Sequence, residues 1–263
     1  MKFYVRGGIG DLLQNFWFIK SNPKSEYLVH THFENAKDIF DHLGVSNCHF
    51  YNFNDMDSHN DQVDLIKTDH ADEDQKNISE TPRAFYSDLD FGDEANLIAE
   101  NFVNSFPVKK DIIGIHPFRS QFAYSVYNHF DLPAKEIPVD IVQKIINDND
   151  NNYLIFGSEK DFSAYGLKES ANVKFVCFKS ILHSLSTVKY CKALIGLDSC
   201  FKSMSSMQRI KTICIIGQFK DETRDAMFIN QYEKDGVMKV YRLKNFELEK
   251  TEVINFLSDA IKE

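Results

Sequence analysis

The chain has 263 residues, of which 43% are hydrophobic and 26% charged, a balance typical of a globular protein with one large or two ordinary domains. Its net charge of −9 argues against a broad nucleic-acid-binding face, because affinity for phosphates comes mainly from clustered lysine and arginine. No apolar stretch approaches the roughly 20 residues that span a bilayer, and the first residues do not resemble a signal peptide, so we expect a cytoplasmic protein.

The cysteines and histidines show no metal-binding spacing. The five cysteines include no Cys-x-x-Cys pair, so they predict neither a zinc site nor a disulfide framework, and we expect reduced thiols. The nine histidines show no His-Glu-x-x-His or similar pattern. We therefore predict no metal.

The first part of the chain alternates between strand and helix patterns. Residues 2–5 predict a strand, a glycine turn follows, and apolar residues from Leu12 to Ile19 recur at helical spacing. Further strands are expected at 27–30, 49–53 and 63–66, and helices at 36–43 and 94–106. Residues 54–75 are polar and acidic, which is typical of a solvated segment.

A second alternating pattern begins after Pro107 and Lys109-Lys110, which we interpret as a linker. Strands are expected at 112–116, 153–156, 173–178, 193–196 and 212–217, and helices at 139–147, 181–191, 200–207 and 249–262. Such alternation predicts parallel sheets with right-handed crossovers in an α/β fold. The expected domains are residues 1–108 and 109–245, followed by a C-terminal helix within 246–263.

Polar and glycine-rich clusters follow the predicted strands. They lie at residues 7–11, 116–119, 157–161, 198–202 and 217–220. Ligands of parallel α/β sheets bind outside the carboxyl ends of the strands. A single glycine turn is more often plain turn geometry, but five such clusters in the expected places predict a binding cleft.

The order of these segments resembles the heptosyltransferase-like glycosyltransferases of family 9. Gly8-Ile9-Gly10-Asp11-Leu12-Leu13 resembles their first turn. The later matching segments, in chain order, are Ile115-His116-Pro117, Lys135-Glu136-Ile137-Pro138, Gly157-Ser158-Glu159-Lys160-Asp161, Ala193-Leu194-Ile195-Gly196-Leu197-Asp198-Ser199 and Ile215-Ile216-Gly217. The resemblance implies a GT-B fold, in which two Rossmann-like domains with parallel sheets face each other across the active site.

Some positions depart from the pattern of that family. Its Asp-Ser-Gly-x-x-His reads Asp198-Ser199-Cys200-Phe201-Lys202-Ser203 here, so a cysteine replaces the glycine and a serine replaces the histidine. Ile137 replaces a tryptophan, and residues 120–133 form a longer segment than is usual. These changes bear on the sugar and the nucleobase more than on the fold.

The resemblance places the catalytic aspartate of the family at Asp11. A carboxylate near the acceptor can remove the hydroxyl proton as the anomeric carbon is attacked. The alternative role for Asp11 is a helix N-cap, and both roles can hold together. Gly8, Gly10 and Gln14 are the accompanying acceptor-side candidates.

The leaving nucleoside diphosphate needs cations or backbone N–H groups at a helix start. Lys135 matches the phosphate-binding lysine of the family, Arg119 is the second candidate, and the helix start at Ser199 is the third. Lys202 could replace a donor contact that the altered motif has lost, or it could be an exposed helical lysine. We expect the second. Ser158, Asp161 and Asp198 complete the donor-side candidates; the two aspartates match positions that hold hydroxyls in the family, although each can equally be a helix cap.

The expected activity is an inverting, metal-independent transfer of a hexosyl, pentosyl or heptosyl group. The donor would be a UDP- or ADP-sugar used as a co-substrate, and no cofactor is expected. Asp88-Leu89-Asp90 resembles the metal-binding Asp-x-Asp of another glycosyltransferase fold, but chance explains it better in so acidic a chain.

Two alternatives remain open. The composition is typical of an AT-rich genome, so a phage enzyme could glycosylate a hydroxymethylated DNA base instead of a bacterial glycan. A basic strip around the cleft would favour DNA; its candidate members are Arg6, Lys20, Arg83, Lys109 and Lys110. The missing glycine and histidine also allow a nucleotide-sugar-binding module without catalysis. Aromatic residues within 120–134 could stack on a ligand or fold that segment onto its own domain.

Overall fold

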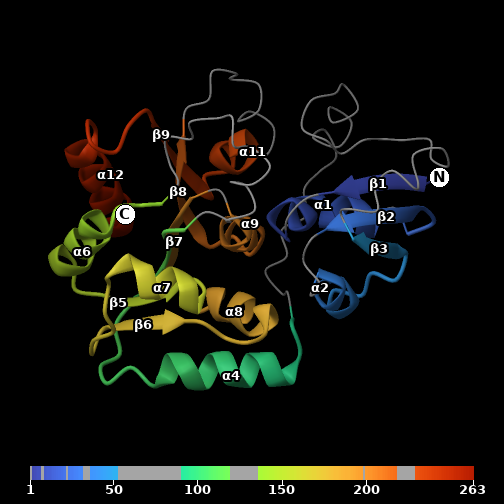
Figure 1. The fold of residues 1–263 in the computed structure, drawn as a ribbon, viewed down its shortest axis with the longest axis horizontal. Helices are drawn as coiled ribbons and strands as arrows, with labels where there is room; N and C mark the ends of the chain where they lie inside the picture. The colour runs from blue at the N-terminus through green and yellow to red at the C-terminus, as the bar shows by residue number, and fades with distance from the viewer. Residues whose placement is uncertain are drawn as a thin grey trace.

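The structure is a computed structural model that describes residues 2–6, 9–21, 23–31, 36–52, 90–118, 136–197, 199–217 and 229–263. The acidic segment 54–75, the strand expected at 63–66 and the aromatic segment 120–134 lie outside the described residues. The remaining elements form two α/β units, which the first view shows side by side (Figure 1).

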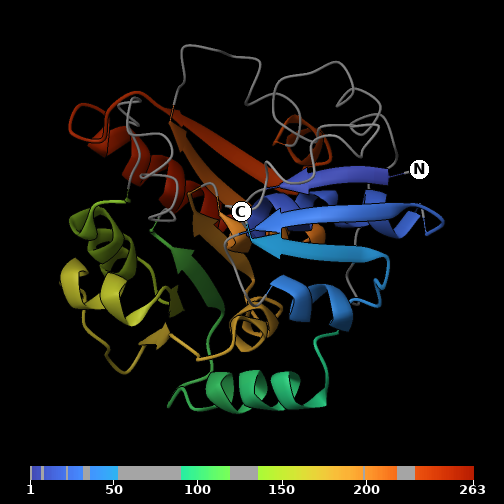
Figure 2. The same ribbon diagram turned by 45° about the vertical axis from the view of Figure 1, so that its right-hand side comes forward.

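The N-terminal unit is a parallel sheet in the order β1-β2-β3. Its elements are β1 (Lys2–Arg6), α1 (Ile9–Ser21), β2 (Glu26–Thr31), α2 (Ala36–His42) and β3 (Cys48–Asn52). The rings of Phe16 and Phe40 meet edge to face at 5.9 Å between centroids, so α1 and α2 share one core. The three strands point with their carboxyl ends toward the second unit (Figure 2).

The C-terminal unit is a six-stranded parallel sheet in the order β6-β5-β4-β7-β8-β9. Its strands are β4 (Ile112–His116), β5 (Asn152–Phe156), β6 (Val173–Val176), β7 (Ala193–Gly196), β8 (Lys211–Gly217) and β9 (Met238–Leu243). The helices are α6 (Val139–Asp148), α7 (Glu159–Tyr165), α8 (Ile181–Val188), α9 (Cys200–Met207), α11 (Ile229–Lys234) and α12 (Lys250–Lys262). The parallel pairing predicted from strand–helix alternation is confirmed.

Three of these elements were not predicted from the sequence. Helix α7 begins inside the polar cluster at 157–161, and its seven residues are too few to show a clear helical periodicity. The edge strand β9 buries Met238 and Leu243 and leaves the residues between them partly or fully exposed, so it lacks the continuous apolar run of a central strand. The third missed element, α11, is a short helix of six residues.

The two units share an apolar core. Helix α1 packs against α9, and one cluster of buried side chains runs from Leu13 and Phe16 of α1 to Phe201 and Met204 of α9. Helix α4 (Asp93–Asn104) packs against α8, and the Lys189 Nζ donates to Asn96 Oδ1 at 2.6 Å. The helix just before the expected boundary at residue 108 therefore contacts the second unit (Figure 1). The boundary itself stays a prediction.

Candidate active site

The sheet of the second unit reverses its direction of growth between β4 and β7. From β4 the chain adds β5 and β6 on one side, and it then returns to add β7, β8 and β9 on the other. His116 at the end of β4 pairs with Gly196 at the end of β7. In open α/β sheets the crevice at such a switch point, outside the carboxyl ends of the strands, is where ligands bind. The candidate site is therefore the edge formed by His116, Gly196 and the residues that follow them.

Two helices begin close together at this edge. Helix α9 starts at Cys200, and the Oγ of its cap residue Ser199 accepts from the Lys202 N–H at 3.3 Å. Helix α1 approaches so closely that a Cβ placed on Gly10 would lie 3.1 Å from the backbone nitrogen of Cys200 and 3.3 Å from the carbonyl carbon of Ser199. Even a methyl group at position 10 would be closer to this backbone than in an ordinary contact, so the two helices would have to move apart slightly. The glycine of the first turn thus permits the contact between the two units.

Asp11 follows Gly10 and is the third residue of α1, whose first helical residue is Ile9. It is therefore inside the first turn and does not occupy the cap position, although a carboxylate in a first helical turn is still favoured by the helix dipole. Gly10 contacts the start of α9, so the backbone of the adjacent Asp11 also lies near that helix start. Gln14 lies one turn further along α1. Gly8 lies outside the described residues, and the side chains of Asp11 and Gln14 are not among those described.

Helix α9 is buried on every side, which the sequence did not predict. Lys202 is only 3% exposed, so the expectation of an exposed helical lysine is wrong. The reason is that α9 lies between the strands β7 and β8 on one side and α1 on the other. Ser203, which stands where the family pattern has histidine, donates from its Oγ to the Ser199 carbonyl at 3.3 Å.

Cys200 stands where the family pattern has glycine. Burial raises the pKa of its thiol to about 12, which is partly offset by hydrogen bonds from the backbone. The thiol is therefore protonated near neutral pH and is a poor nucleophile. Its position beneath Gly10 makes it part of the packing between α1 and α9.

His116 is the other polar residue at the switch point. Its ring lies 4.7 Å from that of Phe201 between centroids, and its Nδ1 is buried without a hydrogen-bond partner among the described residues. Burial lowers the pKa of His116 to about 4, an effect that the negative charge of Asp161 partly offsets. The imidazole is therefore neutral near pH 7. The sequence placed His116 in a strand-end cluster but assigned it no role.

In the turn after β5, the predicted donor-side residues Ser158 and Asp161 form hydrogen bonds with each other. Ser158 caps α7: its Oγ accepts from the Asp161 N–H at 3.3 Å, while Asp161 Oδ2 accepts from the Ser158 N–H at 2.8 Å and from its hydroxyl at 2.7 Å. These bonds form a capping box. The helix-cap role that the sequence allowed for Asp161 is therefore confirmed. All these bonds to the carboxylate go to one oxygen, Oδ2.

Three of the donor-side candidates lie outside the described residues, namely Arg119, Lys135 and Asp198. The described residues that flank the segment 119–135 are Phe118 and Glu136, which form an antiparallel bridge. The chain therefore leaves and returns at the carboxyl end of β4. Burial and the charge of Asp161 both raise the pKa of Glu136.

The described residues hold no group of three or more histidine, cysteine or acidic side chains that could bind a metal. Asp88 lies outside them, and Asp90 Oδ1 accepts from the Gly92 N–H at 2.9 Å beside the start of α4. Among the helices in the described part of the chain, none is long and apolar enough to cross a membrane.

The described members of the proposed basic strip do not lie together at the carboxyl ends of β4 and β7. Lys109 and Lys110 precede β4 and so lie at the amino ends of the strands, and Lys110 pairs with Asp150. The Lys20 Nζ lies 5.6 Å from the centroid of the Phe16 ring, at the far end of α1. The side chain of Arg6 is not described, and Arg83 lies outside the described residues.

No protein-family model matches the sequence, and no curated protein matches it. Solved structures do match. The ADP-heptose LPS heptosyltransferase II of E. coli superposes with a TM-score of 0.60 at 12% identity, over 99% of this chain and 98% of that chain. A family 9 glycosyl transferase from Veillonella parvula DSM 2008 gives the same TM-score and identity over 99% of this chain and 95% of that chain. At such low identity the similarity establishes the fold alone, and it confirms the GT-B architecture expected from the sequence resemblance.

Proposed function

We propose that the protein is a glycosyltransferase that moves a sugar from a nucleoside-diphosphate donor to an acceptor hydroxyl. The observation that carries the proposal is the meeting of the first turns of α1 and α9 at the switch point of a GT-B fold. Both helices present their amino ends there. Helix amino ends favour anions through free N–H groups and the helix dipole.

The diphosphate of the donor would lie at the start of α9. Backbone N–H groups in the first turn would bind its oxygens, and Lys135 and Arg119 would add positive charge from the segment that starts and ends beside β4. Ser199 would shape the turn through its cap. Asp161 would offer its Oδ1 to a hydroxyl of the donor while Oδ2 stays in the capping box. Asp198 would also contact a donor hydroxyl. The proposed donor is a UDP- or ADP-sugar.

Asp11 would act as the base from the opposite unit. As the acceptor oxygen attacks the anomeric carbon, the bond from that carbon to the diphosphate oxygen breaks, the acceptor proton passes to the carboxylate, and the electron pair leaves with the diphosphate. A single displacement of this kind inverts the anomeric configuration. Gly8, Gly10 and Gln14 would line the acceptor side.

The proposal is tested by incubating the full chain with a panel of UDP- and ADP-sugars and measuring release of the nucleoside diphosphate, with bacterial glycans or hydroxymethylated DNA as acceptors. We expect transfer to a glycan and no loss of rate in EDTA. Transfer only to DNA would identify the phage-type alternative, and tight donor binding without turnover would identify a non-catalytic module. Activity lost in EDTA and restored by magnesium or manganese would contradict the metal-independent mechanism.

A further inference from the structure

His116 is a buried histidine at the carboxyl end of β4, and one of its ring nitrogens lacks a protein partner. The exposed fraction of the residue is 9%, and no atom of the described residues forms a hydrogen bond with the Nδ1. Buried polar atoms of folded proteins nearly always have a hydrogen-bond partner in the protein, in water or in a ligand. The unpaired nitrogen therefore indicates a partner that the described residues do not supply.

The alternation of side chains along β4 places His116 on the face of the sheet toward the first unit. Ile113 and Ile115 pack in the core that includes α6 and α12. Gly114 lies on the opposite face, since a Cβ there would be 3.0 Å from the Sγ of Cys191, which belongs to the core that α1 and α9 share. Side chains of a strand alternate between its two faces, so His116 shares the face of Gly114.

The imidazole lies beside the first turn of α9. Its ring centroid is 4.7 Å from that of Phe201, the second residue of that helix. Gly196 pairs with His116 at the end of β7, and a Cβ on this glycine would lie 3.6 Å from the Cβ of His116. Because glycine stands there, no side chain from the last residue of β7 lies beside the imidazole. The unpaired nitrogen is thus held at the amino end of a helix, next to a position without a side chain.

The chemistry of this position favours an anionic oxygen as the missing partner. The amino end of α9 presents backbone N–H groups and a partial positive charge, and both favour anions. Burial keeps the imidazole neutral near pH 7, so one ring nitrogen carries a hydrogen that it can donate. In the unliganded protein, a neutral donor also costs less to bury than a cation would.

We propose that His116 binds the diphosphate of the donor by donating a hydrogen bond from its Nδ1 to a phosphate oxygen. This inference rests on the proposed function and adds a contact from β4 to those expected at the start of α9. The bound oxygen supplies the partner that the Nδ1 lacks within the described residues. His116 is thus a binding residue, and the stability of the unliganded fold does not depend on a hydrogen bond of its Nδ1.

The test compares three substitutions at position 116. His116→Phe keeps an aromatic ring and removes both nitrogens. His116→Asn places an amide nitrogen where the Nδ1 lies, whereas His116→Gln extends the amide toward the position of the Nε2. Calorimetry would measure the affinity of each protein for UDP and ADP, and thermal unfolding would measure the stability of each unliganded protein.

We expect His116→Phe to weaken binding of the preferred diphosphate by about 10- to 100-fold, as for a lost hydrogen bond to a charged group. His116→Asn should keep more of the affinity than His116→Gln, because only its amide starts from the Nδ1 position. His116→Phe should melt at the wild-type temperature or higher, since it removes a buried nitrogen that lacks a partner.

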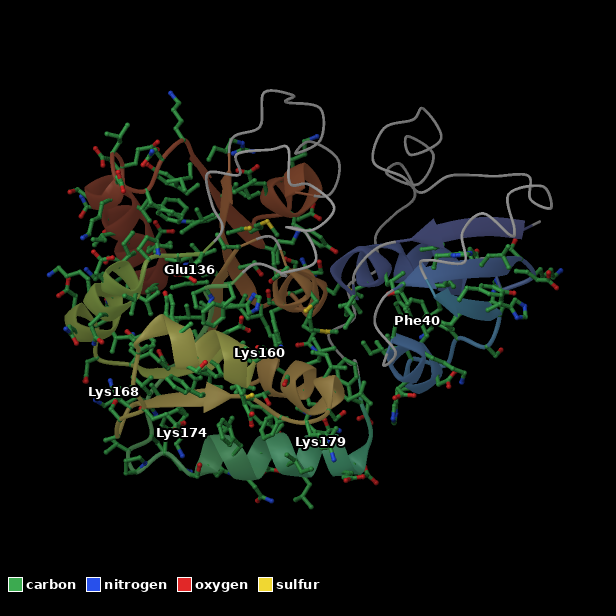
Figure 3. All side chains as sticks on the ribbon, viewed as in Figure 1. Phe40, Glu136, Lys160, Lys168, Lys174 and Lys179 are labelled. Carbon is green, nitrogen blue, oxygen red and sulfur yellow. The ribbon has the colours of Figure 1, made fainter. Side chains whose placement is uncertain are left out.

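His42→Phe is the control for the loss of a histidine and should bind as wild type does. His42 is an exposed histidine in the last turn of α2. This helix, which also contains Phe40, lies in the first unit and away from β4 (Figure 3).

The outcomes separate the two proposals. Wild-type protein that binds neither diphosphate would overturn the proposed function and this inference together. Wild-type affinity in His116→Phe would overturn this inference alone. Binding by His116→Gln that equals or exceeds that of His116→Asn would move the contact to the Nε2, which overturns the role of the Nδ1. If His116→Phe does not fold, the comparison of His116→Asn with His116→Gln decides. Failure of all three variants to fold would show that His116 supports the fold, which also overturns the inference.

Discussion

The turns after β5 and β7 follow strands of the same sheet, and both are predicted to contact the donor. Their surroundings in the structure differ. After β5, Ser158 and Asp161 satisfy each other in a capping box at the start of α7. After β7, the helix start lies against Gly10 of the other unit and its first turn contains a buried lysine. The same sequence signal, a polar turn after a buried strand, thus marks a self-contained helix cap in one place and a contact between units in the other.

The largest effect should come from Asp11, because it is the proposed catalytic base and lies in the first turn of α1, where α1 contacts α9. Asp11→Asn keeps a similar shape but cannot accept the acceptor proton, so the transfer rate should fall by roughly 10²–10⁴-fold. Donor affinity should change little, since the proposed donor site lies mainly on the second unit. Initial rates and thermal melts of the two proteins measure both effects. A variant that is less stable but nearly fully active would leave Asp11 with a structural role only.

The pKa of His116 tests whether water is excluded from the ends of β4 and β7 beside α9, as the burial of the imidazole indicates. The ordinary histidine pKa is about 6.5, and burial lowers that of His116 to about 4, so between these values the unfolded chain binds more protons than the folded one. Stability should therefore be complete above about pH 6.5 and should fall as the pH drops toward 4, by up to about 1.4 kcal/mol per pH unit. The charge that acts on His116 is that of Asp161, which opposes the shift, and the imidazole ring packs against the rings of Phe118 and Phe201.

Urea unfolding at about pH 7 and about pH 5 measures this contribution. His116→Phe retains an aromatic ring and should show a smaller loss of stability between the two values than wild type. An equal loss in both proteins would mean that His116 titrates normally in the folded state.

Gly10 tests the closeness of the contact itself. The methyl group of Gly10→Ala would lie 3.1 Å from the backbone nitrogen of Cys200, which cannot move as a flexible side chain would. Overpacking of this kind costs about 1–3 kcal/mol, partly offset by the better helix propensity of alanine, about 1 kcal/mol. We expect a net loss of about 1 kcal/mol in unfolding free energy together with reduced turnover. Wild-type stability and rate in Gly10→Ala would show that the two helix starts are further apart.

Ser158 gives the smallest effect and tests the other side of the comparison. Ser158→Ala removes the cap of α7 and should lower the unfolding free energy by about 1 kcal/mol, without changing the affinity for the diphosphate. Ser180→Ala is a matched control, since Ser180 caps α8 by accepting from the Leu182 N–H at 3.3 Å. Loss of diphosphate binding in Ser158→Ala alone would make the α7 turn part of the phosphate site.

The strands and helices that the sequence predicted are those with strong local patterns. The central strand at Ile112–His116 has a continuous apolar run, and α12 repeats apolar residues at helical spacing, so both could be read locally. The edge strand β9 and the short helix α7 have no such pattern, because one face of an edge strand and most of a short helix remain exposed.

The sequence predicted which segments form the candidate site but not which of its side chains are buried. The glycine turn at Gly10 and the helix start at Ser199 were predicted because turns and helix starts have local sequence signals; the structure adds that Ser199 caps α9. The burial of Lys202 was missed because it depends on α1 packing over α9, a contact between residues almost 200 positions apart that periodicity does not report. The roles of Asp11 and Lys135 stay predictions.

A crystal structure of the full chain with bound UDP or ADP would test the central claim most directly. The account predicts that the phosphate oxygens accept from backbone N–H groups in the first turn of α9, close to His116 and facing the start of α1 across Gly10. Phosphates bound at the capping box of α7, or away from the carboxyl ends of β4 and β7, would contradict it.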